Sequence, residues 1–329
     1  TAVAPAAALQ KDTVSVTVAG TPVVLFRDAA GRARGLVDRC PHRGVQLSLG
    51  TVVDGCLTCP FHGWRFDGEG RCVEVPWNPD ARRETLGALP VPVQERGGLL
   101  WVFTEAGAVT TDEPLYVPAI LERRDITVTT ERVRWRTHWS RAMENMLDWP
   151  HLPFVHNGTI GRDMRGQRMD IAWAETPSGG TTSIVIDDEP QPGRLDWLYP
   201  NAMVLAVLDT PRRTMSMFVS VIPVDEGTTD MLLCTARSFL RARIFNPLFR
   251  LANRRIAGED RAVVESSWPA AVPVASAERS VRTDQPTLVF RKRYHALVAA
   301  SGGGPDANRA EARRSLTILP TGTNQAPSA

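Results

Sequence analysis

The sequence predicts an α+β protein in which a small all-β domain is followed by a larger domain of antiparallel strands and helices. Three observations predict this. Short β-branched and aromatic runs separated by glycine-containing turns fill the first hundred residues, a connection-like composition follows, and strand-like runs mixed with two helical segments occupy most of the rest. With 329 residues, the chain is long enough for two domains of ordinary size.

The first domain is predicted from regularly spaced strand and turn signals. Turns containing aspartate and glycine occur at residues 28–31 and 67–70. The strand-like runs around them are residues 14–18, 22–26 and 99–103. Such short runs between turns are typical of a small all-β domain.

Residues 104–118 have the composition of a connection between domains, with two prolines, a glycine and acidic residues. We therefore predict a first domain at 1–108 and a second at 109–300. The tail at 301–329 is rich in Gly, Ala, Asn, Ser and Pro. It offers little apolar area to bury, so we predict that it is disordered.

The second domain combines strands with helices. Two helical segments are predicted at 140–147 and 246–267, the latter with apolar residues at roughly helical spacing. The strand-like runs are residues 126–130, 181–186, 203–208, 215–223 and 231–239. Together they predict a broad antiparallel sheet, which makes this domain α+β.

Charge and hydropathy exclude several functional classes. Lys+Arg 38 nearly balance Asp+Glu 36, and a net charge of +2 does not predict a nucleic-acid partner. No apolar run approaches the roughly 20 residues that a membrane-spanning helix needs. The Ala-rich start lacks a basic region and contains Pro5, unlike a secretory signal, so we expect a cytoplasmic location.

Two short motifs near the N-terminus pair cysteine with histidine. Cys40 and His42 form a C-x-H motif, and Cys59 and His62 form a C-x2-H motif. A Rieske 2Fe-2S centre needs this set, because two thiolates hold one iron and two imidazoles hold the other. The alternative is a zinc site. Common zinc motifs pair Cys with Cys at one end and His with His at the other. Each motif here pairs one Cys with one His, which favours the 2Fe-2S cluster over zinc.

A second constellation lies in the first helical segment and just beyond it. His151 and His156 are five residues apart, which on an unbroken helix would leave their side chains roughly 140° apart. Pro150 and Pro153 break the helix, so both rings can reach one metal. Asp148, three residues before His151, is spaced to accept the remaining ring N–H of that histidine.

The third ligand of a facial two-histidine, one-carboxylate iron site must come from elsewhere in the chain. Asp260 in the long helical segment is the best candidate, and Glu259 beside it is the local rival. A His-x4-His pair alone is weak evidence for a metal site. The evidence is stronger here because four of the six histidines of the chain fall in the two motifs. We interpret the other two, His138 and His295, as ordinary structural residues.

From about residue 22 to about residue 293, these motifs and their order resemble the oxygenase component of Rieske non-haem iron oxygenases. The resemblance implies a helix-grip, START-like catalytic domain. It also implies the ligand roles, which fall on Cys40, His42, Cys59 and His62 for the cluster and on His151, His156 and Asp260 for mononuclear Fe(II). In homotrimeric relatives, the residue matching Asp148 also contacts the second cluster histidine, here His62, of a neighbouring subunit.

The resemblance implies an enzyme with O2 as cosubstrate, a small organic or natural-product substrate, and electrons from a separate NAD(P)H-dependent reductase or ferredoxin. No flavin or nicotinamide motif is visible in the chain. We favour monooxygenation, and dihydroxylation, oxidative demethylation and desaturation remain alternatives within the family. The alternative from another class is a Rieske electron carrier with an added binding domain.

Overall fold

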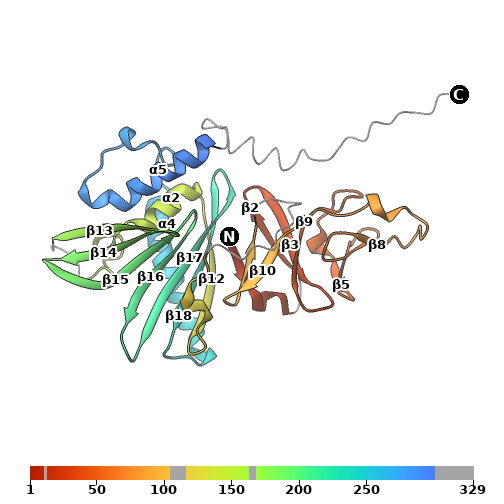
Figure 1. Cartoon of the computed structure of the whole chain (residues 1–329), viewed down its shortest axis with the longest axis horizontal. Coiled ribbons are helices and arrows are strands. Elements are labelled where there is room, and N and C mark those ends of the chain that lie inside the picture. Colours follow the sequence, from red (N-terminus) through yellow and green to blue (C-terminus); the bar gives the residue numbers. More distant parts are fainter. Residues whose placement is uncertain (11–12, 104–115, 163–167, 301–329) are drawn as a thin grey trace.

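The computed structural model describes residues 1–10, 13–103, 116–162 and 168–300. The expected domain boundary after residue 108 and the tail from residue 301 lie outside this part of the chain. The predicted fold class is confirmed: small antiparallel sheets come first, and a large antiparallel sheet with helices follows (Figure 1). No described helix is both long and apolar enough to cross a membrane.

The N-terminal part contains three small antiparallel sheets, with strand orders β1-β11-β10, β2-β3-β4-β9 and β5-β6-β7-β8. Their bounds are β1 Ala2–Pro5, β2 Val14–Val18, β3 Thr21–Arg27, β4 Ala33–Val37, β5 Thr51–Val53, β6 Cys56–Thr58, β7 Arg65–Phe66, β8 Cys72–Glu74, β9 Pro90–Val91, β10 Val93–Arg96 and β11 Leu99–Val102.

Both predicted turns in this part are confirmed and have the same design. The Asp28 carboxylate accepts the amide of Ala30, and the Asp67 carboxylate accepts the amide of Glu69, each at 2.9 Å. The aspartate side chain thereby replaces a backbone acceptor and holds the turn closed.

The second part is built on a seven-stranded antiparallel sheet with the order β12-β18-β17-β16-β15-β14-β13. Its strands are β12 Thr127–Trp135, β13 Met169–Thr176, β14 Gly179–Ile186, β15 Glu189–Leu198, β16 Ala202–Asp209, β17 Thr214–Asp225 and β18 Thr228–Arg237. The predicted strands are confirmed. β13 and β15 were not predicted.

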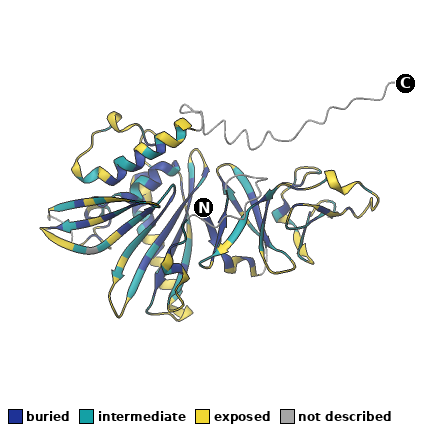
Figure 2. Ribbon diagram, viewed as in Figure 1, coloured by how far each residue is buried: buried dark blue, intermediate teal, exposed yellow. Residues whose placement is uncertain are grey.

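The central strands of this sheet are apolar on both faces because both faces are covered. Phe218 and Leu232 pack toward the N-terminal sheet of β1 and β11, whereas their neighbours Val219 and Leu233 pack toward the helices. Successive side chains of a strand point to opposite faces, so two covered faces require a continuous apolar run. Figure 2 shows the buried residues along these central strands.

The helices are α1 Ala119–Glu122, α2 Trp139–Leu147, α3 Leu152–Val155, α4 Asn246–Val264 and α5 Gln285–Ala300. Both predicted helices are confirmed as α2 and α4; α2 begins one residue earlier and α4 ends three residues earlier than predicted. α2 and α4 contact the sheet and each other, and α5 packs on α2 (Figure 1).

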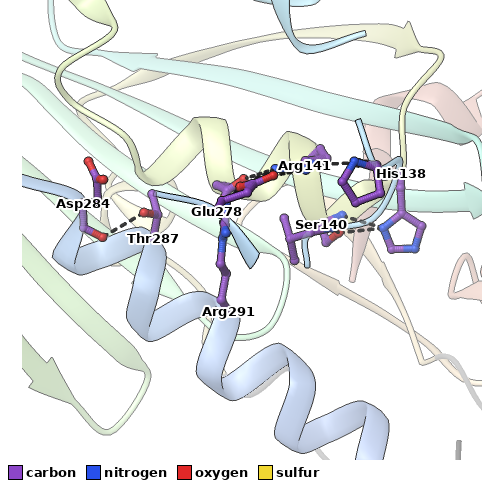
Figure 3. Close-up of polar contacts among 10 residues, drawn as sticks. His138, Ser140, Arg141, Glu278, Asp284, Thr287 and Arg291 are labelled. Carbon is purple, nitrogen blue, oxygen red and sulfur yellow. Dashed lines mark hydrogen bonds and ion pairs between the residues drawn. The ribbon is translucent and has the colours of Figure 1, made fainter. Parts of the chain in front are cut away.

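A network of two buried arginines and two partly buried glutamates ties α5 to α2. Figure 3 labels three of its members, Arg141, Glu278 and Arg291. Arg141 of α2 donates to Glu144 at 3.0 Å and to Glu278 at 2.8 Å, and Arg291 of α5 donates to the same two glutamates. The hydrogen bonds from Arg141 and Arg291 outweigh burial and hold the pKa of Glu278 below its usual value. Each glutamate therefore accepts hydrogen bonds from both guanidinium groups.

Replacing Arg291 by methionine is expected to destabilise this region by about 3 kcal/mol, because removal of this buried arginine leaves two partly buried carboxylates undercompensated. For a domain of this size, the melting temperature should fall by about 6 to 12 °C in circular dichroism. The control is Lys292→Met, at an exposed position on the same helix, which should change the melting temperature very little. Equal effects of the two variants would contradict a structural role for the network.

Candidate metal centres

The two Cys/His motifs occupy two loops that close in the same way. Both loops have a glycine at φ of +71° or +73°, a conformation in which a side chain would be strained. In the first loop, the amide of Cys40 donates to the carbonyl of Val45 at 2.8 Å, and the amide of Gly44 donates to the carbonyl of Cys40 at 2.9 Å. The second loop repeats this pattern: the amide of Cys59 donates to the carbonyl of Trp64 at 2.8 Å, and the amide of Gly63 donates to the carbonyl of Cys59 at 3.0 Å. The loops therefore present matched Cys-plus-His pairs.

The four side chains of these loops come together with sulfur inside and nitrogen outside. Cys40 and Cys59 are buried, and the rings of His42 and His62 are half-buried with their centroids 4.7 Å apart. Nδ1 of His42 is buried without a hydrogen-bond partner among the described residues. Two thiols beside two imidazoles, with an unpartnered ring nitrogen, fit the donor set of a Rieske cluster.

The electrostatics of Cys40 reflect its position in the loop. Burial and the adjacent Cys59 thiol raise the pKa of Cys40 to about 11, although backbone hydrogen bonds from His42 and Arg43 oppose the rise. Those amides face the sulfur, as expected for loops that stabilise a thiolate bound to metal. All five cysteines are free; outside the motifs, Cys72 and Cys234 are buried and Cys56 is half-buried.

The second constellation forms where the helix α2 ends. Asp148 caps the C-terminus of α2, His151 begins the short helix α3, and His156 follows its last residue. The break at Pro150 thus separates two short helices, and the two imidazole centroids lie 5.3 Å apart. The sequence predicted breaks at Pro150 and Pro153; the break at Pro150 is found, whereas Pro153 lies in the first turn of α3, where a proline is tolerated.

Asp260 from α4 joins the two histidines. One ligand atom from each of His151, His156 and Asp260 lies within 4.8 Å of the others. Oδ1 of Asp260 is 3.4 Å from Nε2 of His151 and 3.0 Å from Nε2 of His156. That oxygen is buried and accepts no hydrogen bond of good geometry. Three donors that converge without bonding one another fit a ferrous ion held on one face.

A carboxylate holds each imidazole from behind. Nδ1 of His151 is 2.9 Å from Oδ2 of Asp148, and Nδ1 of His156 is 2.8 Å from Oε2 of Glu259. Thr159 also donates to Oε2 of Glu259 at 2.8 Å. Glu259, considered above as a rival ligand, therefore lies behind His156 and outside the converging set.

The charge states in the metal-free site follow from these contacts. Burial opposes both shifts, but the paired carboxylates raise the pKa of His151 to about 9, and the two histidines lower the pKa of Asp260 to about 2. Asp260 is therefore ionised at neutral pH, as a metal ligand must be.

A cavity of about 470 Å³ opens beside the three converging side chains. Apolar residues of β14 to β18 and one side of α4 line most of it. Trp135 and Trp149 are buried and also border this cavity. His138 and His295 take no part in the described metal-binding group, in keeping with their structural interpretation.

Comparison with known families identifies both parts of the chain. Residues 1–91 match the Rieske 2Fe-2S domain, and residues 135–202 and 190–300 match the vanillate O-demethylase oxygenase C-terminal domain. An oxygenase domain in the second half disfavours the carrier alternative, and a Rieske domain in the first disfavours the zinc site.

Curated relatives agree with this result. Methylxanthine N1-demethylase NdmA of Pseudomonas putida is 30% identical over 298 residues, which cover 83% of this chain and 79% of that protein. The oxygenase component of dicamba O-demethylase from Stenotrophomonas maltophilia is 34% identical over 45% of this chain and 43% of its own length. Chlorophyllide a oxygenase of Chlamydomonas reinhardtii is 36% identical over 47% of this chain but only 24% of its own length.

Solved structures extend the likeness to the whole fold. NdmA superimposes with a TM-score of 0.75 at 25% identity and covers 94% of this chain and 92% of its own. Dicamba monooxygenase bound to 3,6-dichlorosalicylic acid also has a TM-score of 0.75, at 20% identity, over 92% of this chain and 97% of its own. The chain therefore belongs to the Rieske non-haem iron oxygenases, enzymes with a 2Fe-2S cluster, a mononuclear iron centre and O2 as cosubstrate.

Proposed function

We propose that this chain is the terminal oxygenase of a multicomponent system and transfers one oxygen atom of O2 to a small organic substrate. Its electrons come singly from a separate NAD(P)H-dependent reductase or ferredoxin. The observation that carries the proposal is the presence, in one chain, of a Cys2His2 loop pair and a His2Asp group that borders a substrate-sized cavity.

In this proposal Cys40, His42, Cys59 and His62 hold the cluster, and His151, His156 and Asp260 hold the ferrous ion. When bound, the cluster supplies electrons and the ferrous ion activates dioxygen. Asp148 and Glu259 accept the Nδ1 protons of the two histidines, which leaves each Nε2 lone pair directed at the metal. The apolar cavity walls limit the access of water.

The proposed reaction consumes one O2, two electrons and two protons, places one oxygen atom on the substrate and releases the other as water. Hydroxylation of a C–H bond satisfies this balance. Demethylation does so as well, because a hydroxylated methyl group leaves as formaldehyde. Relatives described as demethylases support the second outcome as strongly as the first.

We also propose that the working unit is a homotrimer in the cytoplasm. Figure 1 shows β5 and β8 of the cluster-bearing part at the far end of the molecule from α2 and α4. Asp260 lies on α4, and His151 and His156 flank the short helix α3 that follows α2. Electron transfer within one chain would have to cross that separation. A neighbouring chain can bring its cluster loops close to Asp148, and five free cysteines suit a reducing compartment.

The test is metal analysis combined with turnover. Purified holoprotein should contain about three irons and about two acid-labile sulfides per chain, the sum of one Rieske cluster and one mononuclear site. With a surrogate reductase, 18O from labelled O2 should appear as a single atom in an alcohol product. If the product is demethylated, formaldehyde should form in an amount equal to the O2 consumed, and its label is lost because its oxygen exchanges with water. Two irons per chain with neither labelled alcohol nor formaldehyde would contradict the proposal.

A further inference from the structure

The cavity beside the iron-site residues has an unusual balance of charge. Among its described lining residues none is lysine or arginine, and its only ionisable groups are Asp148, His151, His156 and Asp260. Five methionines contribute to the wall, a soft and adaptable apolar surface. They are Met146, Met203, Met215, Met217 and Met231.

The iron site leaves no positive charge for a substrate anion. Asp148, Glu259 and Asp260 bring three negative charges around the metal position, against two positive charges on one ferrous ion. Arg255 balances the remaining negative charge. It pairs with Glu259 at 3.3 Å on the side away from the cavity, and its side chain is largely exposed. A carboxylate in this cavity would be desolvated without a cationic partner, which is strongly unfavourable.

The cavity does offer hydrogen-bond donors. Asn253 is buried, its Oδ1 accepts from Thr235 at 3.0 Å, and its Nδ2 has no partner among the described residues. Nε1 of Trp149 and Nδ2 of Asn145 are buried and likewise lack partners there. All three residues line the cavity. Buried donors without partners are costly, so a ligand that supplies acceptors relieves that cost.

We propose that the cavity takes uncharged, largely apolar substrates that carry a carbonyl or ether oxygen, and that it rejects carboxylates. The proposal rests on the oxygenase function proposed above and gives that function a substrate class. The acceptor oxygen bonds to one of the three donors, Asn253 above all, and the hydrocarbon skeleton lies against the methionine-rich wall. This orientation turns another part of the skeleton toward the metal position.

Three probes with one skeleton test the class: 2-acetonaphthone, 2-isopropenylnaphthalene and 2-naphthoate. Equilibrium binding to the oxidised holoprotein, followed by calorimetry without reductant, avoids turnover. We expect the ketone to bind about tenfold more tightly than the hydrocarbon, the worth of one good hydrogen bond, and the acid to bind at least about 100-fold more weakly than the ketone. Binding of the acid as tight as that of the ketone overturns the proposal, as does failure of all three to bind.

Asn253→Leu should remove the tenfold preference for the ketone and leave hydrocarbon binding unchanged. Arg250→Leu, at an exposed position on the same helix, should leave both affinities unchanged. If Asn253→Leu does not fold, Trp149→Phe removes a different donor while keeping an aromatic ring, and it should reduce the same preference. A preference that survives both donor variants contradicts the role of these donors.

Gln191→Arg supplies the missing cation at the cavity wall and should improve binding of 2-naphthoate by at least about tenfold. Unchanged binding of the acid would overturn the charge argument. The two proposals fail in different ways. If the proposed oxygenase function is wrong, iron or product will be missing, but the ketone will still bind more tightly than the acid. If the proposed substrate class is wrong, the acid will bind more tightly than the ketone to a protein that has its full iron content and turns over.

Discussion

Replacing Asp260 by alanine is expected to remove about one iron per chain and to abolish turnover, while the absorption and electron resonance spectra of the cluster persist. The reason is geometric. Asp260 is the one carboxylate of the converging group, and its Oδ1 faces Nε2 of both His151 and His156. Two histidines alone would bind a ferrous ion weakly and without the facial geometry that oxygen activation requires.

The matched control is Glu259→Gln, a neighbouring carboxylate on the same helix. Glu259 touches the outer nitrogen of His156, so its loss should weaken iron binding by about 10- to 100-fold without removing a ligand. Iron analysis at several free-iron concentrations separates the two variants, because added iron should restore Glu259→Gln and not Asp260→Ala. If turnover survived loss of Asp260 and vanished with Glu259→Gln, the ligand role would belong to Glu259.

The contrast between these two residues shows what the sequence could predict about the site. His151 and His156 share a short segment whose prolines dictate its shape, so local reasoning could bring them together. Asp260 lies more than a hundred residues later in the second predicted helix, and local reasoning left Glu259 as its rival until the family resemblance assigned the role to Asp260. Adjacent residues on a helix point about 100° apart, so only one of Glu259 and Asp260 can face the metal position. The orientation of α4 decides which one, and orientation is a tertiary property.

Other parts of the fold could not be predicted from the sequence because they also depend on tertiary contacts. β1 has little strand character of its own and exists because it pairs with β11. α5 has no clear apolar stripe, and its position depends on Arg291 and the network beneath it. The cavity could not be predicted from the sequence because residues of six strands and of α4, far apart in the chain, line it. The two metal-binding motifs, by contrast, are short and carry their own turn and break signals.

Asp148→Asn is expected to slow electron transfer from the cluster to the iron site by about 10- to 100-fold, with both metal sites occupied and the trimer intact. Asp148 accepts the backbone amide of His151 at 3.0 Å and lies 2.9 Å from its Nδ1. Its side chain is about a quarter exposed, which leaves it accessible to a neighbouring subunit. An amide keeps the shape of this group but loses the charge and the paired acceptors of the carboxylate.

Single-turnover kinetics can separate a bridge between subunits from simple support of a ligand. A prereduced variant is mixed with substrate and O2, and oxidation of the cluster is followed by its absorbance. Glu259→Gln is again the control, because Glu259 supports His156 as Asp148 supports His151 but has no proposed contact with His62 of a neighbour. Both variants are measured with the iron site saturated. Slow electron transfer in Asp148→Asn alone supports a bridge between subunits, whereas equal slowing in both variants means that Asp148 only supports the ligand His151. A wild-type rate in Asp148→Asn would refute either role, and a fully active monomer in sedimentation would refute the intersubunit path.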